Sequence, residues 1–92
     1  MDLDPTQLHP NKLYLHLVRT IMPRPIAWVS TVSPTGVLNL APYSFFNAFN
    51  YVPPVIGFSS IGRKDSLNNI EATGEFVWNL VTRELAEGMN QT

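Results

Sequence analysis

The chain has 92 residues with 45% hydrophobic and 11% aromatic content, so it is predicted to fold as one small domain with a thin core and not to be disordered. Six basic and seven acidic residues give a formal net charge of −1, which argues against nucleic acid or an anionic membrane surface as the main partner. The chain has no cysteine, which excludes disulfides and thiolate chemistry, so any redox role would need a bound cofactor.

The first twelve residues are polar and marked by prolines, and they are predicted to form a leader outside the core. They lack the basic flank and apolar centre of a signal peptide. No apolar run approaches the roughly 20 residues of a membrane span, so a cytoplasmic protein without a membrane partner is expected. Residues 13–18 alternate weakly between apolar and polar side chains, and a short helix and a strand both remain open.

A β-hairpin follows the leader. Ile26–Val32 is rich in β-branched and aromatic residues, as is typical of a strand. Ser33–Gly36 has proline and glycine where a tight turn needs them, and Val37–Ala41 returns as the partner strand. Because Ser30 and Thr31 are adjacent on a strand, their side chains must face opposite sides of the sheet.

Residues 42–54 are predicted to form a loop that is too apolar to be a simple solvated connection. Within it, Ser44, Phe45, Phe46 and Asn47 place hydroxyl and amide groups among aromatic rings. A flat heteroaromatic ligand needs that mixture of apolar walls and a few polar groups. The alternative, modestly favoured for an isolated loop, is that the rings belong to the core and the polar groups bond the local backbone.

The next segment reads as a strand, a polar turn and a helix. Val55–Phe58 is continuously apolar and is predicted to be a strand buried on both faces. Asp65 and Ser66 are predicted to cap a short helix that Gly74 ends.

The polar turn between them is a candidate phosphate site. It carries hydroxyls at Ser59, Ser60 and Ser66 and a cation at Lys64, next to Arg63. The start of a helix adds unpaired N–H groups and a partial positive charge, which attract anions. Taken alone, the segment fits an ordinary capped helix better, because caps are commoner than phosphate sites.

The chain closes with a fourth predicted strand, Glu75–Val81, and a helix over residues 83–90 capped by Thr82. Asn39 and Asn79 interrupt apolar strands, and a buried amide without a partner costs about 1–3 kcal/mol, so structural roles are favoured over ligand contacts. Short strands joined by turns predict a small barrel or sandwich. Four strands close a barrel poorly, so a second chain or a longer polypeptide is expected to complete it.

The usual hydrolase and metal motifs are missing. Gly57–Ile61 resembles a nucleophile elbow but lacks the closing glycine, and no histidine follows it. His9 and His16 are not spaced as metal ligands, and no phosphate-binding glycine loop is present. A conventional hydrolase is therefore not expected.

Four blocks of sequence, taken together, resemble the flavin reductase-like, FMN-binding split-barrel family. The blocks are Arg24–Val32, Asn39–Asn47, Lys64–Ile70 and Gly74–Val81, and the resemblance runs from about residue 23 to residue 90. It implies a mainly β fold, an antiparallel split β-barrel with short helices. It also implies a homodimer with FMN near the interface, and a single domain over residues 1–92 that is truncated relative to the family.

The resemblance further implies ten flavin contacts in three groups. They are Ser30 and Thr31 beside the flavin, Ser44, Phe45, Phe46 and Asn47 at the isoalloxazine ring or ribityl chain, and Ser59, Ser60, Lys64 and Ser66 around the phosphate. The family usually has threonine where this chain has the last of these serines, and the hydroxyl is kept.

The function that the resemblance implies is that of a flavin reductase. The cofactor would be FMN, with FAD as the alternative, and NAD(P)H would be the co-substrate. Hydride transfer to flavin is the cofactor's own chemistry, so no catalytic side chain is predicted. The electrons would pass to free flavin, iron or a partner monooxygenase. Two alternatives stay open: an electron-transfer module without its own NAD(P)H site, and a dimerisation fragment without cofactor.

Overall fold

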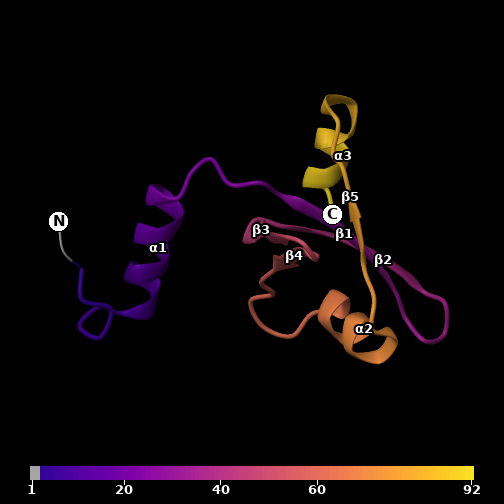
Figure 1. Cartoon of the computed structure of the whole chain (residues 1–92), viewed down its shortest axis with the longest axis horizontal. Helices are drawn as coiled ribbons and strands as arrows, with labels where there is room; N and C mark the ends of the chain where they lie inside the picture. Colours follow the sequence, from indigo (N-terminus) through magenta and orange to yellow (C-terminus); the bar gives the residue numbers. More distant parts are fainter. Residues whose placement is uncertain (1–2) are drawn as a thin grey trace.

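Two antiparallel sheets form the body of the computed structural model, which describes residues 3–92 (Figure 1). The first sheet has the strand order β2-β1-β5 and the second pairs β3 with β4. The strands are β1 (Ala27–Val32), β2 (Leu38–Tyr43), β3 (Phe46–Tyr51), β4 (Pro54–Phe58) and β5 (Val77–Asn79). The helices are α1 (Pro10–Thr20), α2 (Asp65–Thr73), a 3₁₀ turn (Arg83–Leu85) and α3 (Ala86–Asn90). The mainly β fold with short helices is confirmed, and within residues 3–92 the sheets stay open and do not close a barrel.

The predicted hairpin is present as β1 and β2. The two strands pair antiparallel from Ala27 opposite Tyr43 to Val32 opposite Leu38. The turn between them closes through the N–H of Gly36, which donates to the carbonyl of Ser33 at 2.9 Å. Gly36 has φ of 89°, a conformation that glycine adopts easily. The glycine at this position of the sequence therefore predicted the turn correctly.

The prediction of a loop over residues 42–54 is wrong. β2 continues to Tyr43, and β3 begins at Phe46 and pairs with β4 in a register that shifts between Ala48 and Asn50. Asparagine and proline have low strand propensity, which hid the strand in the sequence. Cross-strand pairing of Phe46 with Phe58 supplies what local propensity lacks.

Burial of β4 on both faces is also wrong. Val55 is 41% exposed and Ile56 is 39% exposed. β4 pairs with a single strand in a two-stranded sheet, so part of its surface stays uncovered. A continuous apolar run does not show whether one or both faces of a strand are buried, because burial depends on segments that are distant in the sequence.

The core lies where the two sheets and the segment before β5 meet. Ala27 and Val29 of β1 are fully buried beside Tyr43 of β2. The ring of Tyr43 lies 4.5 Å from that of Phe58, which in turn meets Phe76 edge-on at 5.1 Å. Aromatic pairs in such geometries stabilise beyond their buried area, so this short chain of rings holds β2, β4 and the approach to β5 together.

Two amide–hydroxyl hydrogen bonds fasten α2 to the first sheet. Nδ2 of Asn39 donates to Oγ of Ser66 at 2.8 Å, and Nδ2 of Asn69 donates to Oγ1 of Thr31 at 3.0 Å. The predicted cap by Asp65 and Ser66 is wrong: Lys64 occupies the N-cap position, and the Ser66 hydroxyl bonds the strand instead. Ser66 is 1% exposed, and this bond gives its buried hydroxyl a partner in the half-buried amide of Asn39.

The strand and the helix that follow α2 differ from the predicted ones in length and type. β5 spans Val77–Asn79, which is shorter than the expected strand over 75–81. The predicted helix over 83–90 is divided into the 3₁₀ turn and α3. Thr82 does precede it, but its contribution is a carbonyl, which accepts from the N–H of Leu85 at 3.0 Å. The expected end of α2 is confirmed, since Gly74 has φ of 77° and donates to the Ile70 carbonyl at 2.7 Å.

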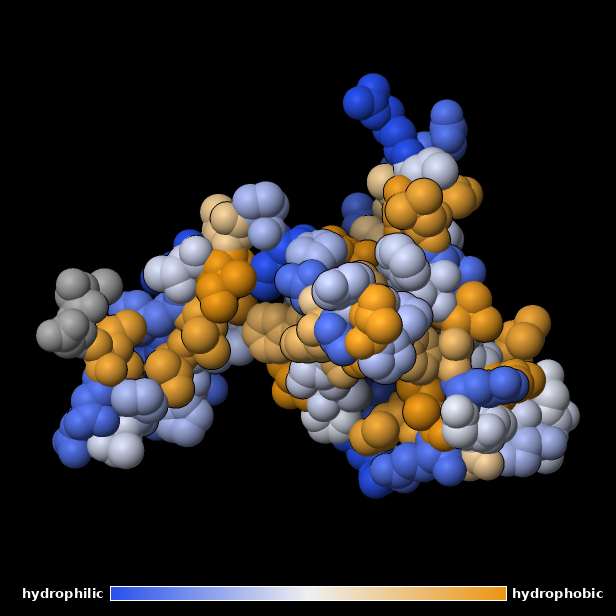
Figure 2. Space-filling model, viewed as in Figure 1, coloured by the Kyte–Doolittle hydropathy of each residue, from blue (hydrophilic) through white to orange (hydrophobic). Residues whose placement is uncertain are grey.

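α1 resolves the alternative between helix and strand at residues 13–18 in favour of a helix, and it begins inside the predicted leader. It stands to one side of the sheets in Figure 1, and all eleven of its residues are exposed or half-buried. Hydrophobic residues show on its surface in Figure 2, in agreement with exposures of 42% at Leu15 and 45% at Leu17. Within residues 3–92, no helix has the length and apolarity that crossing a membrane requires.

Candidate functional site

Four of the ten predicted contact residues line one cavity of about 110 Å³, here called the turn cavity. They are Ser44 and Phe45, from the turn between β2 and β3, and Ser59 and Lys64, from the segment between β4 and α2. The remaining lining residues are Pro42, Tyr43 and Ile61. The N–H of Ser59 donates to the carbonyl of Phe45 at 2.9 Å and joins the two segments. Residues about 15 positions apart in sequence therefore form one polar pocket.

Lys64 is the cation of the turn cavity. It is exposed, and its Nζ lies 5.8 Å from the centre of the Tyr43 ring. An ammonium over an aromatic face is attracted by the negative face of the ring, which favours an orientation of the side chain toward the cavity. Within the described residues Lys64 has no ion pair, so its charge is available to an anion.

Arg63, the neighbouring cation, is already paired. Its Nη1 donates to Oε2 of Glu71 at 2.7 Å and to Oδ1 of Asn68 at 2.9 Å, and its Nη2 donates to Oε1 of Glu71 at 3.1 Å. These bonds raise the pKa of Arg63 and lower the pKa of Glu71. Both side chains are more than half exposed, so the pair contributes little to overall stability.

Arg24 holds the other wall of the cavity in place. Its Nη1 donates to the carbonyls of Val18 at 2.9 Å and Ile21 at 2.6 Å, at the end of α1, and its Nε donates to the carbonyl of Ser44 at 3.3 Å. The guanidinium also lies 5.5 Å from the centre of the Phe45 ring. Sequence reasoning missed this role, although an arginine between two prolines is a backbone-fixed position that could have signalled it.

Tyr43 lines the turn cavity but is not among the ten contact residues that the sequence predicts. It is 5% exposed, and among residues 3–92 its hydroxyl has no hydrogen-bond partner. An unpaired buried hydroxyl costs free energy that a phenyl ring of the same shape avoids.

Tyr43→Phe is therefore expected to leave the free energy of unfolding unchanged or to raise it by up to about 1 kcal/mol. The ring contacts with Phe58 and Lys64 are kept in this variant. Urea unfolding followed by tryptophan fluorescence measures the change. A loss of stability would mean that the hydroxyl has a partner that the present arrangement does not include.

Three other predicted residues lie outside the turn cavity. Ser60 donates its hydroxyl to the carbonyl of Gly62 at 3.0 Å and lines a separate apolar cavity of about 310 Å³ beside α2. Asn47 is exposed, and its Oδ1 accepts from the N–H of Ala48 at 2.8 Å. The ring of Phe46 packs 5.5 Å from that of Trp78. In this arrangement they shape the turns and sheets around the cavity.

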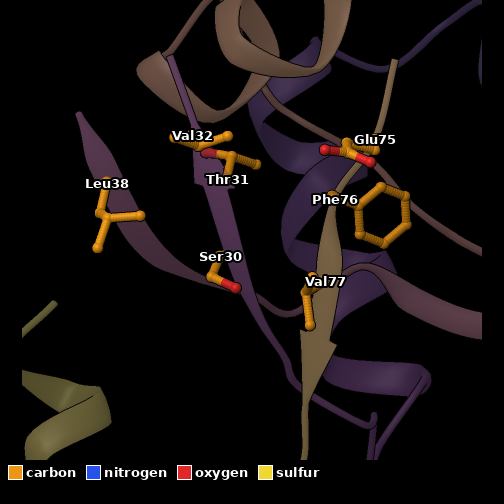
Figure 3. A pocket seen from close by; sticks show the side chains of 7 residues that line it. All are labelled: Ser30, Thr31, Val32, Leu38, Glu75, Phe76 and Val77. Atoms are coloured by element: carbon orange, nitrogen blue, oxygen red, sulfur yellow. The ribbon is translucent and has the colours of Figure 1, made fainter. Parts of the chain in front are cut away.

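Ser30 and Thr31 line a third cavity of about 220 Å³, shown in Figure 3. β1 passes there between Leu38 of β2 and the residues leading into β5, among them Glu75. Oγ of Ser30 accepts from Nδ2 of Asn79 at 3.2 Å. The two hydroxyls face opposite sides of the sheet as predicted: Thr31 is buried beneath α2, and Ser30 is half-buried.

The strand asparagines are both hydrogen-bonded inside the fold, as their favoured structural role requires. Asn39 bonds Ser66, and Asn79 donates to the carbonyl of Trp28 at 3.0 Å as well as to Ser30. Ser66 is 1% exposed, so its hydroxyl lies beneath α2 and apart from the lining of the turn cavity. Among residues 3–92, no cluster of three or more histidine or acidic side chains could hold a metal ion.

Comparison with known families places this arrangement in context. The model of the "Flavin reductase like domain" matches residues 18–92. An uncharacterized protein of Aquifex aeolicus is 46% identical over 84% of this chain, and one of Deinococcus radiodurans is 46% identical over 95% of it. The chain spans 42% of the length of each of these relatives.

Two solved structures share the fold closely. Nitrilotriacetate monooxygenase component B from Bacillus cereus superposes with a TM-score of 0.87 and 34% identity, over all of this chain and 49% of its own. Pseudomonas fluorescens 2-nitrobenzoate 2-nitroreductase superposes with a TM-score of 0.86 and 33% identity, over 98% of this chain and 45% of its own. The open sheets described above are therefore part of the fold that these larger proteins contain.

Proposed function

The chain belongs to the flavin reductase-like domain family, and from that premise we propose that it binds FMN and takes part in hydride transfer from NAD(P)H to flavin. The observation that carries the proposal is the convergence of Lys64, Ser44 and Ser59 on the turn cavity. A cation without an ion pair and two hydroxyls are donors of the kind that a phosphate monoester needs. FAD is the alternative flavin, since it also carries phosphate groups.

The size of the cavity decides which part of the flavin it fits. Pockets for whole small molecules usually measure roughly 300–1,000 Å³, and the turn cavity measures about 110 Å³. It therefore suits the phosphate end, with the ring system lying outside it. This fit supports the implied phosphate contacts of Ser59 and Lys64. Because Ser44 and Phe45 line the same cavity, we propose that they too lie at the phosphate end of the flavin and not at its ring.

Two of the other implied contact residues, Thr31 and Ser66, are proposed to act indirectly, by holding α2 in place. Thr31 and Ser66 fix α2 against the first sheet through Asn69 and Asn39. We propose that these two hydroxyls act on the phosphate by holding α2, whose N-cap is Lys64. The contacts of Ser30, Phe46, Asn47 and Ser60 with the flavin remain proposals that rest on the family resemblance.

The bound flavin would supply the hydride-accepting chemistry. The residues of this chain would bind and orient it, and no acid, base or nucleophile is required of them. We further propose that residues 1–92 belong to one domain, that two copies pair, and that NAD(P)H in the cytoplasm is the reductant. The B. cereus neighbour is named as a component of a monooxygenase, which supports a monooxygenase as one candidate acceptor here.

Absorption spectroscopy tests the proposal directly. The purified chain is mixed with FMN, passed through gel filtration and scanned in the visible range, and flavin bands are expected to travel with the protein. Addition of NADH or NADPH is then expected to bleach the bound flavin. Retained flavin that neither nucleotide reduces would favour the electron-transfer alternative, and colourless protein would contradict flavin binding by this chain.

A further inference from the structure

We propose that Arg63 and Glu71 form a positioning pair that aims Lys64 into the turn cavity. The inference rests on the proposed function, because it concerns the same phosphate end of the flavin. It assigns the two adjacent cations of the turn to different tasks. Lys64 would meet the anion, and Arg63 would hold the backbone that carries Lys64.

The geometry separates the two cations clearly. Lys64 is among the residues that line the turn cavity, whereas Arg63 lies outside that lining. The Arg63 guanidinium instead makes two hydrogen bonds to the Glu71 carboxylate and one to Asn68, at 2.7–3.1 Å. Both partners are on α2, so the side chain of Arg63 lies along the helix that Lys64 begins.

The backbone before the helix needs such a restraint. Gly62 has φ of 80° with nothing within 4 Å of the position where a Cβ would be, so it lies in a conformationally free and open turn. One bond from the Ser60 hydroxyl to the Gly62 carbonyl fixes the start of the turn. The forked contact of Arg63 fixes its end, directly before Lys64. A bidentate arginine–carboxylate pair defines an orientation as well as a distance.

The positioning role predicts a result of opposite sign to that of simple electrostatics. Glu71 is the carboxylate that pairs with Arg63, so removing it leaves the charge of Arg63 without a partner next to Lys64. If only the local field mattered, Glu71→Ala would bind an anion more tightly. If the pair positions Lys64, the same substitution binds a phosphate more weakly.

The experiment compares FMN with riboflavin, which lacks the phosphate, by titration of flavin fluorescence with the full chain. The ratio of the riboflavin Kd to the FMN Kd reports the phosphate contact alone. Glu71→Ala is expected to lower this ratio roughly three- to fivefold, the range that an exposed ion pair can supply, and to leave the riboflavin Kd unchanged. The swapped pair Arg63→Glu with Glu71→Arg is expected to recover most of the ratio.

Glu87→Ala is the matched control, because it removes one exposed carboxylate from α3, outside the turn cavity. It is expected to keep the wild-type ratio. An unchanged or increased ratio in Glu71→Ala overturns the positioning role, and so does an equal loss of affinity for both flavins. If the wild-type chain binds neither flavin, the proposed function itself fails and this inference falls with it. If it prefers FMN and Glu71→Ala keeps that preference, the inference alone fails.

Discussion

Replacing Lys64 with methionine is expected to weaken FMN binding by about tenfold or more and to leave riboflavin binding unchanged. A hydrogen bond to a charged group contributes about 1.5–3 kcal/mol, and about 1.4 kcal/mol corresponds to a factor of ten in Kd. Methionine keeps most of the apolar stem of lysine but lacks the ammonium, whose nitrogen lies 5.8 Å from the centre of the Tyr43 ring, so the variant removes the charge with little change in the packing of the stem. Fluorescence titration of both flavins against wild type and variant measures the difference.

Ionic strength provides an independent check on Lys64. The lysine is exposed, so its attraction for a phosphate is screened by salt. Wild-type affinity for FMN is expected to fall between about 0.05 and 0.5 M salt, and the affinity of Lys64→Met is expected to fall much less. Lys12→Met, at an exposed lysine in α1, is the matched control and should behave as wild type. Equal loss for FMN and riboflavin in Lys64→Met would contradict a phosphate contact.

Elements whose signal is local could be predicted from the sequence. The β1–β2 hairpin depends on a turn that Gly36 permits, and α2 ends where Gly74 adopts positive φ. Both features are properties of a few neighbouring residues, so they are readable without knowledge of distant contacts. The family resemblance also depends on local blocks, and the match over residues 18–92 confirms it.

Features that depend on distant partners could not be predicted in the same way. β3 was hidden because its asparagines disfavour a strand and its partner lies across a turn. Ser66 has the sequence position of a cap, yet its hydroxyl bonds Asn39, which is 27 residues away. A helix-capping pattern and a helix-docking pattern use the same residue types, and only the tertiary fold distinguishes them.

In the candidate site, too, residue types could be predicted from the sequence, whereas the contacts between distant segments could not. Ser44, Phe45, Ser59 and Lys64 meet because β3 pairs with β4, with Phe46 opposite Phe58, and the hydrogen bond from the N–H of Ser59 to the carbonyl of Phe45 extends this pairing into the two turns. Nothing in the spacing of these segments fixes that bond. The sequence could name the donors by residue type and resemblance, whereas the separation of Lys64 from its neighbour Arg63 emerged from the geometry of α2 alone.

The aromatic core carries the largest expected effect on stability. Phe58→Ala is expected to lower the free energy of unfolding by about 3 kcal/mol, at the lower end of the range for phenylalanine truncation in cores, because this ring is half-buried. The ring joins Tyr43 at 4.5 Å to Phe76 at 5.1 Å, so its removal opens the contact between β2, β4 and the approach to β5. For a chain of this size, with roughly 5–14 kcal/mol of total stability, the loss is a large fraction.

Phe49→Ala is the matched comparison, since it removes the same ring from a position that is 71% exposed. Its expected effect is within about 0.5 kcal/mol of wild type, as for most surface changes. Urea unfolding of both variants, followed by tryptophan fluorescence, separates them by the difference in midpoint at equal slope. If Phe49→Ala lowers the midpoint as far as Phe58→Ala does, the surface around β3 and β4 is covered in solution, as it would be if a second polypeptide packed there, because only burial makes the loss of the Phe49 ring costly. If both variants keep the wild-type midpoint, the predicted role of the Phe58 ring in the core is wrong.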